Sequence, residues 1–355
     1  MTFSRIAPAL ASALLLCACS KEDPNLTVSQ QLADQVLLPA YSQWAEANQT
    51  LAKTSAAFCA EQSSLEQTRT QYLAAQNQWA ALQPLLVGPL SEGNRAWQVQ
   101  FWPDKKDLVA RQVEILLKRT PSLTEADLTK ASVAVKGLSA YEYVLFDERI
   151  DLNDAAQKSR YCPLLVAIAD YQSTLASQVL SEWQADQGMQ QRLKAFPNSQ
   201  YSESSEAIAE LLRIQVNAID GLKKKLGAPM GRQTKGIIQP FQAEAWRSNA
   251  SLSTLRAAVG SAKALWQGQN QGVGLSHLVP KEHDQIIGKI DQAFADLEQR
   301  LDAQTQPLSV LLNDEQGRQA LDDIYQSLNT VHRLHEGELA QALGITLGFN
   351  AHDGD

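Results

Sequence analysis

The stretch SLEQTRTQYLAAQNQW, residues 64–79, carries its apolar side chains on one helical face. Leu65, Tyr72, Ala75 and Trp79 recur three, four or seven positions apart, which is the spacing of an amphipathic α-helix. Similar spacing continues along most of the chain, which is rich in Ala, Leu, Gln and Glu. We find no credible pair of strands. We therefore expect an all-α protein built of helical bundles.

A second stretch, SLSTLRAAVGSAKALW at residues 251–266, matches the first at a constant offset of 187 positions. The identical pairs are Ser64 and Ser251, Leu65 and Leu252, Arg69 and Arg256, Ala75 and Ala262, and Trp79 and Trp266. Five identities in sixteen can arise by chance in helices of this composition, but the repeated Arg and Trp favour a duplication. We predict two related helical-bundle halves, residues 28–200 and residues 201–355. The boundary is expected in FPNSQYSESSE, residues 196–206, where Pro, Asn and Ser cluster.

The N-terminal stretch has the pattern of a secretory signal peptide. Arg5 precedes an apolar run from Ile6 to about Leu16, which is too short to span a membrane. The ending Leu-Cys-Ala-Cys resembles a bacterial lipobox, which implies cleavage before Cys19 and acylation of its thiol. The alternative is an ordinary signal peptide with two incidental cysteines. We expect a lipoprotein signal at residues 1–18 and a lipidated tether at residues 19–27. Ser20 then favours sorting to the outer membrane, with the body facing the periplasm.

Two further cysteines, Cys59 and Cys162, lie in the body of the chain. A compartment outside the inner membrane is oxidising, which favours a disulfide between them over two buried free thiols. The bridge would close a loop of about 100 residues, for which chain entropy predicts a stabilisation of up to about 4.7 kcal/mol.

The charge balance argues against a nucleic-acid partner. The chain carries a formal net charge of −8 and a pI near 5.3, whereas nucleic-acid binding needs a basic face. An acidic surface is compatible with cation binding, but in most proteins such charge is only a solvated face.

The longest irregular segment is VGPLSEGNRAWQVQFWPDKKDLVARQ, residues 87–112. It combines three aromatic residues with charges of both signs, which suits either packing against the bundle or part of a binding site. The candidate site residues in it are Glu92, Arg95, Trp102, Asp104 and Lys105.

A second candidate segment is GLSAYEYVLF, residues 137–146. Ser139 and Glu142 lie three positions apart and so share one helical face. Ser-x-x-Glu is also the capping-box pattern, and Gly137 is a natural break before it. The segment is therefore either a helix cap, a polar site facing a cleft, or both.

Three segments together resemble the imelysin family of bacterial envelope proteins: GPLSEGNRAWQVQFWPDKK, GLSAYEYVLF and the C-terminal ELAQALGITLGFNAHDGD. The resemblance implies a mostly helical, periplasmic or lipid-anchored protein with two bundle-like halves. It also implies a link to iron regulation and uptake. The family is classed among metallopeptidases on a G-x-H-x-x-E signature, which maps onto Gly137, Ser139 and Glu142 here.

Ser139 stands at the position of the signature histidine, and this departure weakens the expectation of peptidase activity. A catalytic zinc site normally takes three protein ligands, and a serine hydroxyl is a poor ligand for such a metal. Only the Glu142 carboxylate of the signature remains as a metal ligand. The chain also contains no H-E-x-x-H motif.

The resemblance further implies that the C-terminal segment docks on the body. Asn350 and Asp353 would then join Glu142 and Glu92 in one cleft, and such oxygen-rich clusters suit a divalent or ferric ion. A fallback metal site is His332 and His335, followed by Glu336 and Glu338, on one helix. The alternative for that helix is an ordinary solvated polar face.

These observations support three hypotheses. The first is a non-catalytic role in uptake of iron or another metal ion, by binding an ion, an iron complex or a partner protein. Glu142 would then be a ligand or charge anchor, and Arg95 and Lys105 would orient acidic groups. The second is a metallopeptidase with ligands from outside the signature. The third is a scaffold that binds only other envelope proteins.

Overall fold

A computed structural model describes residues 23–120, 123–270 and 272–347. Within these ranges every regular element is a helix, so the all-α prediction is confirmed. None of the described helices is both long enough and apolar enough to cross a bilayer. Cys19 and its leader lie outside the described residues, and so do Asn350 and Asp353.

The first half of the chain contains three long helices and several short ones. Its elements are α1 (Pro24–Leu32), η1 (Ala33–Leu37), α2 (Leu38–Cys59), α3 (Leu65–Leu82), η2 (Gln83–Leu85), η3 (Gly88–Ser91), α4 (Arg95–Val99), α5 (Leu108–Arg119), α6 (Glu125–Thr129), η4 (Val133–Val135), α7 (Leu138–Phe146), α8 (Ala155–Gln184) and α9 (Met189–Arg192). Helix α3 begins with a complete capping box between Ser64 and Gln67. The irregular segment of the sequence thus contains only short helical turns before α5.

The second half has four long helices. Its elements are α10 (Ser204–Gly227), η5 (Pro240–Gln242), α11 (Ser251–Gln267), η6 (Leu275–Leu278), η7 (Lys281–His283), α12 (Gln285–Asp302), α13 (Leu308–Leu311), α14 (Glu315–Arg333), η8 (Leu334–Leu339) and α15 (Ala340–Ala342). The domain boundary expected at residue 200 stays a prediction. That position lies between α9 and α10.

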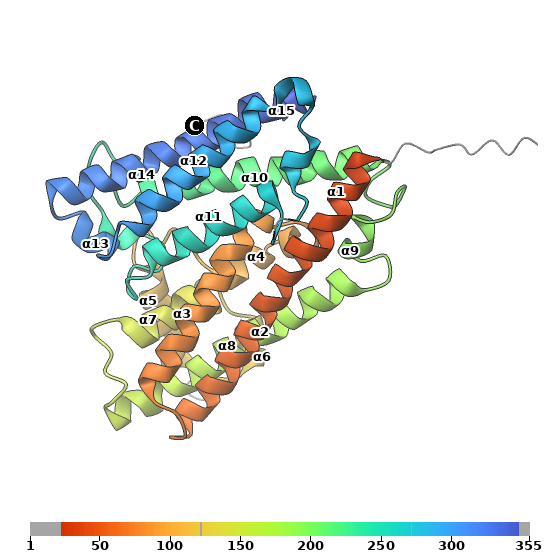
Figure 1. Cartoon of the computed structure of the whole chain (residues 1–355). Helices are drawn as coiled ribbons and strands as arrows, with labels where there is room; N and C mark the ends of the chain where they lie inside the picture. The colour runs from red at the N-terminus through yellow and green to blue at the C-terminus, as the bar shows by residue number, and fades with distance from the viewer. Residues whose placement is uncertain (1–22, 121–122, 271, 348–355) are drawn as a thin grey trace, which may run out of the picture.

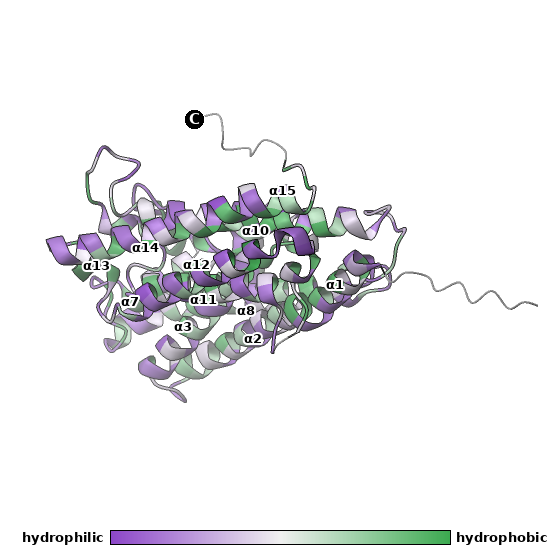
Figure 2. Ribbon diagram, turned by 45° about the horizontal axis from the view of Figure 1, so that its top comes forward, coloured by the Kyte–Doolittle hydropathy of each residue, from purple (hydrophilic) through white to green (hydrophobic). Residues whose placement is uncertain are grey.

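The long helices form two layers (Figure 1). Helix α2 packs along α8 and α3, while α14 packs along α10 and α12. Helices α3 and α11 lie side by side and join the layers. Hydrophilic and hydrophobic segments alternate along the helices, as expected when each turns one face inward (Figure 2). The buried side chains form one core that runs through both halves.

The two repeated stretches form α3 and α11, and the shared arginine and tryptophan make similar contacts in each, whereas Ser64 caps α3 and Ser251 does not cap α11. Arg69 donates to the carbonyl oxygen of Leu145 at the end of α7, with distances of 3.1 and 2.9 Å. Arg256 donates to the carbonyl of Leu301 at the end of α12. The indoles of Trp79 and Trp266 each donate to a side-chain oxygen, at 2.8 and 2.7 Å. These shared contacts fit a duplication, and the two related halves stay a prediction.

The disulfide between Cys59 and Cys162 is confirmed. It joins the end of α2 to the second turn of α8, with 5.6 Å between the Cα atoms and a sequence separation of 103. The bridge therefore links α2 and α8, which pack along one another.

Candidate functional site

Helix α7, which contains GLSAYEYVLF, begins where two backbones meet closely. A Cβ atom on Gly137 would lie 2.4 Å from the carbonyl oxygen of Val99 and 2.9 Å from that of Gln98. Because real side chains do not approach a backbone so closely, only glycine fits at this position. Gly137 thereby seats the start of α7 against the end of α4.

The capping-box interpretation of Ser139 and Glu142 is wrong. Gly137 is the residue that precedes the helix, so Ser139 lies within the first turn of α7 and caps nothing. Its hydroxyl donates instead to the carbonyl oxygen of Phe101, at 2.9 Å. Ser139 thus ties α7 to the irregular segment.

Glu142 makes one of the contacts between the halves. Its carboxylate oxygen Oε1 accepts hydrogen bonds from the backbone N–H of Ser248 at 2.9 Å and from the Ser248 hydroxyl at 2.7 Å. Ser248 belongs to the connection between η5 and α11, in the second half. Glu142 is only 4% exposed, and this burial raises its pKa.

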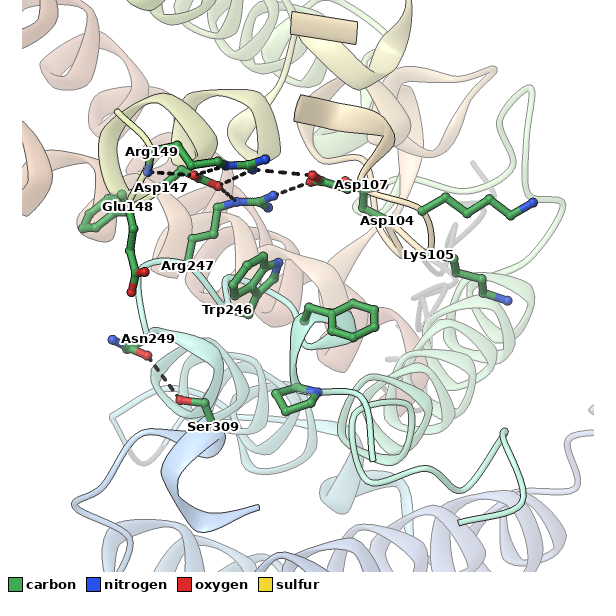
Figure 3. A pocket seen from close by; sticks show the side chains of 14 residues that line it. Asp104, Lys105, Asp107, Asp147, Glu148, Arg149, Trp246, Arg247, Asn249 and Ser309 are labelled. Atoms are coloured by element: carbon green, nitrogen blue, oxygen red, sulfur yellow. Dashed lines mark hydrogen bonds and ion pairs between the residues drawn. The ribbon is translucent and has the colours of Figure 1, made fainter. Parts of the chain in front are cut away.

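Four charged residues form a closed cluster beside this contact (Figure 3). Arg247 donates to Asp107 at 2.6 Å and to Asp147 at 3.0 Å, and Arg149 donates to Asp147 at 2.6 and 2.8 Å. Burial alone would raise the pKa of Asp147, but the hydrogen bonds from Arg149 and Arg247 outweigh it and lower the pKa to about 2. The two carboxylates and the two guanidinium groups neutralise one another.

The backbone around the cluster is strained. Asp107, Ala245 and Asn249 have positive φ angles of 48°, 51° and 57°, a region that non-glycine residues rarely occupy. Such conformations persist only where the surrounding contacts determine them, and they gather at binding sites. The Asp107 carboxylate bonds to Arg247 and Arg149, and Ser248 is held by Glu142.

The cluster forms one wall of a pocket of about 880 Å³, called here the outer pocket. It is lined by residues 104–107, residues 146–149, Pro240, Phe241, Trp246, Arg247, Asn249 and Ser309. A much smaller inner cavity of about 20 Å³ is lined by Ser139 and Glu142. The two spaces share Asp104, Phe241, Trp246 and Arg247 as lining residues. The inner cavity has room for about one water molecule.

The structure brings together some of the residues selected from the sequence. Lys105 and Asp104 line the outer pocket, and Trp102 lines the inner cavity beside Ser139 and Glu142. Asp104 accepts the N–H groups of Leu108 and Val109 and so caps the start of α5. Trp102 donates its indole N–H to the carbonyl of Gln242, at 2.9 Å.

Two predicted residues lie apart from both spaces. Arg95 forms a bidentate pair with Glu182 on α8, at 2.5 and 3.0 Å. Glu92 is exposed and lines neither space. The expectation that these two would lie near Glu142 is therefore not supported.

Sequence reasoning missed the second-half wall, above all Trp246, Arg247 and Ser248. A signal for it was present. AEAWRSN, residues 243–249, places a tryptophan, an arginine and a serine in a connection between helices, away from any amphipathic pattern. Asp107, Asp147 and Arg149 were missed as well, since Arg247, which joins Asp107 to Asp147, comes from a distant position.

A family model described as Imelysin, Peptidase_M75, matches residues 37–335. The chain belongs to the imelysin family.

Two solved structures share the imelysin fold with this chain. An imelysin-like protein from Psychrobacter arcticum 273-4 aligns with a TM-score of 0.77 and 19% identity, covering 92% of this chain and 97% of that one. A putative iron-regulated protein A precursor from Parabacteroides distasonis ATCC 8503 aligns with a TM-score of 0.69 and 16% identity, covering 89% and 96%. No curated protein matches significantly. At these identities the likeness establishes the fold.

The fallback metal site of this imelysin-family chain does not lie on a solvated helix face. His335 is fully buried, packs edge-on against Trp266 and Phe294, and bonds through Nδ1 to the carbonyl of Val331 at 2.8 Å. Burial lowers its pKa to about 4. His332 is also buried, 3.6 Å from the Glu336 carboxylate. The expectation of a surface-exposed pair is wrong because this helix packs against α10 and α12.

The donor set does not fit the metal that the imelysin signature implies. Serine replaces the signature histidine, its hydroxyl bonds to Phe101, and Glu142 already accepts two hydrogen bonds from Ser248. Nowhere in the described ranges do three His, Cys, Asp or Glu side chains gather as a metal site would require. Glu142 as a metal ligand stays a prediction.

Proposed function

We propose that this imelysin-family protein is a non-catalytic binding protein of the bacterial envelope that takes part in iron acquisition. The outer pocket between the two halves receives an iron complex or its organic part. The observation that carries the proposal is the Glu142–Ser248 contact. It uses the signature carboxylate to hold the second-half wall in place, beside a pocket of a size that suits a small ligand.

Two other observations support this function. One solved structure of the same fold is named as an iron-regulated protein precursor, which fits a role in iron metabolism. The described residues also provide no constellation that favours the metallopeptidase alternative, because the signature serine and glutamate are both engaged in structural hydrogen bonds. The pocket favours a binding protein over a scaffold without a ligand.

The cellular location is part of the proposal. Acylation of Cys19 would anchor the protein to the outer membrane, with its body in the periplasm. The Cys59–Cys162 bridge supports an oxidising compartment. Replacing Cys19 with alanine should release the protein from the membrane fraction, whereas Cys17→Ala, two positions earlier, should leave it there. A chain that remains membrane-bound without Cys19 would contradict the lipid anchor.

The function itself is tested by the iron content of cells. Cells that lack the protein should accumulate less iron under iron limitation than cells that carry it. The Trp97→Ala variant should restore uptake, because Trp97 is exposed and lies outside the outer pocket. The Trp246→Ala variant should not restore it, since Trp246 lines that pocket. Equal iron content with and without the protein would refute an acquisition role.

A further inference from the structure

The walls of the outer pocket define the chemistry of its occupant. We infer that the pocket binds a flat organic anion, of the kind that an aryl carboxylate or a catecholate presents, and not a bare metal ion. This inference rests on the proposed binding function and specifies its ligand class.

Three of the acidic side chains that line the outer pocket already have partners. Asp107 and Asp147 are paired with Arg149 and Arg247 within the cluster. Asp104 accepts two backbone N–H groups at the start of α5, at 2.6 and 3.1 Å. These three carboxylates are thus already engaged, so a cation would have to displace existing partners. That displacement costs the full desolvation of the groups left behind.

The other charged side chains of the outer pocket are available to a ligand. Among the described lining residues, Asp104, Lys105, Lys106 and Glu148 have no ion-pair partner. Asp104 accepts two backbone N–H groups at the start of α5, so the charged groups left unengaged are those of Lys105, Lys106 and Glu148. The lining as a whole carries four positive and four negative charges. Figure 3 shows Lys105 on the side of the pocket away from Asp147, with Trp246 beside Arg247. An anion of low charge can therefore pair with two unengaged ammonium groups, whereas a cation finds one unengaged carboxylate.

The aromatic side chains in the wall of the outer pocket favour a flat ligand. Phe241 leaves 47% of its surface exposed at the pocket, and its neighbour Pro240 adds apolar surface. The guanidinium of Arg247 lies 4.3 Å from the centre of the Trp246 ring, which orients that ring at the pocket wall. Aromatic rings on a preformed wall favour stacking with a flat partner. A volume of about 880 Å³ suits a small molecule or a compact chelate.

The binding of matched probes to the purified full chain tests this inference by calorimetry. The probes are 2,3-dihydroxybenzoate as a flat anion, cyclohexanecarboxylate as a puckered anion, benzylamine as a flat cation, and Fe³⁺ supplied as ferric citrate. We expect the flat anion to bind at least about tenfold more tightly than either organic control. Its affinity should fall as salt is added, because the lysines contribute through charge.

Variants then locate the binding. The double variant Lys105→Ala/Lys106→Ala should lower the affinity about tenfold and weaken the salt dependence, whereas Lys118→Ala/Lys130→Ala, two exposed lysines outside the pocket, should not. Trp246→Ala and Phe241→Ala should each lower it, and Trp97→Ala should not. Phe241 is exposed, so its removal tests stacking in a protein that still folds.

The outcomes separate the two proposals. The inference is overturned if the puckered anion or the flat cation binds more tightly than the flat anion. It is also overturned if the lysine and aromatic variants bind the flat anion with the affinity of the wild type. Binding of ferric citrate without the flat anion also overturns it but leaves the iron-acquisition function standing. No binding of any probe, together with unchanged cellular iron, refutes both.

Discussion

The carboxylate of Glu142 accepts both the backbone N–H and the hydroxyl of Ser248, a residue 106 positions further along the chain. The two residues come from different halves, and Glu142 is buried at their junction. The signature glutamate therefore acts as a structural link that holds the wall of the outer pocket.

Glu142→Ala should lower the free energy of unfolding by about 2 kcal/mol, because it removes a buried acceptor and leaves the half-buried Ser248 N–H without a partner. Glu142→Gln keeps an acceptor oxygen and should cost less than about 1 kcal/mol. Burial raises the pKa of Glu142 above 4.5, so its contribution is full below that pH and is lost as the pH rises through the raised pKa. Urea unfolding should therefore show that the stability of the Gln variant relative to wild type is greater at pH 8 than at pH 4. A constant difference would contradict the buried contact.

Gly137→Ala should destabilise the protein by about 2 kcal/mol or more, since its Cβ would meet the Val99 carbonyl at 2.4 Å. The matched control is Gly260→Ala, in the exposed middle of α11, where a Cβ meets nothing within 4 Å. That change should stabilise the protein by about 0.5–1 kcal/mol. Thermal unfolding of both variants checks the pair, and similar effects in both would be inconsistent with a close backbone approach at Gly137.

Arg69→Met and Arg256→Met should each cost about 1–2 kcal/mol, because each arginine bonds to carbonyl oxygens at or just beyond the end of a helix in its own half. Arg213→Met, on the exposed face of α10, should change stability by less than about 0.5 kcal/mol. Equilibrium unfolding in urea measures all three. A large effect at one repeated arginine only would argue against equivalent roles in the two halves.

Asp147→Asn should lower stability by about 2 kcal/mol at pH 7. The folded-state pKa of Asp147 is about 2, below the ordinary 3.8, so its ionised form stabilises the fold above pH 4. This contribution is lost as the pH falls from about 4 towards 2. The difference in the free energy of unfolding between wild type and variant should therefore shrink as the pH is lowered from 5 to 3. Asp186→Asn, at an exposed position, serves as the control, and an unchanged difference at pH 3 would count against the ion-pair cluster.

Reduction of the Cys59–Cys162 bridge should cost about 2–5 kcal/mol, because it closes a loop of 103 residues in the unfolded chain. Urea unfolding with and without reductant measures the loss. The double variant Cys59→Ser/Cys162→Ser should match the reduced protein and should not respond to reductant. Equal stability of oxidised and reduced wild type would show that the bridge constrains nothing.

Much of the fold was predictable because it depends on local patterns. Leu65, Tyr72, Ala75 and Trp79 follow a helical period, and helical hydrogen bonds join residues near in sequence. The pairing of Cys59 with Cys162 was predictable because two cysteines in the body allow one internal bridge. Arg69 and Arg256 suggested the duplication because they match at a constant sequence offset, and each bonds to a carbonyl oxygen near the end of a helix in its own half.

The candidate site was predictable only in part. Ser139, Glu142, Trp102, Asp104 and Lys105 do line the two adjoining spaces, while Arg95 pairs with Glu182 instead. The cap interpretation failed because the sequence pattern Ser-x-x-Glu does not reveal where a helix begins. The close approach of Gly137 to Val99 decides that point.

The sequence by itself determined the helical class and the disulfide, since each follows from periodicity, composition or counting, and it suggested the duplicated halves. Only the tertiary structure decided that Ser248 meets Glu142 and that Arg247 meets Asp107 and Asp147, because Arg247 and Ser248 lie in a connection about a hundred residues or more away. No local rule links such positions. Their meeting follows from the packing of α3 against α11, which brings the second-half wall to the end of α7.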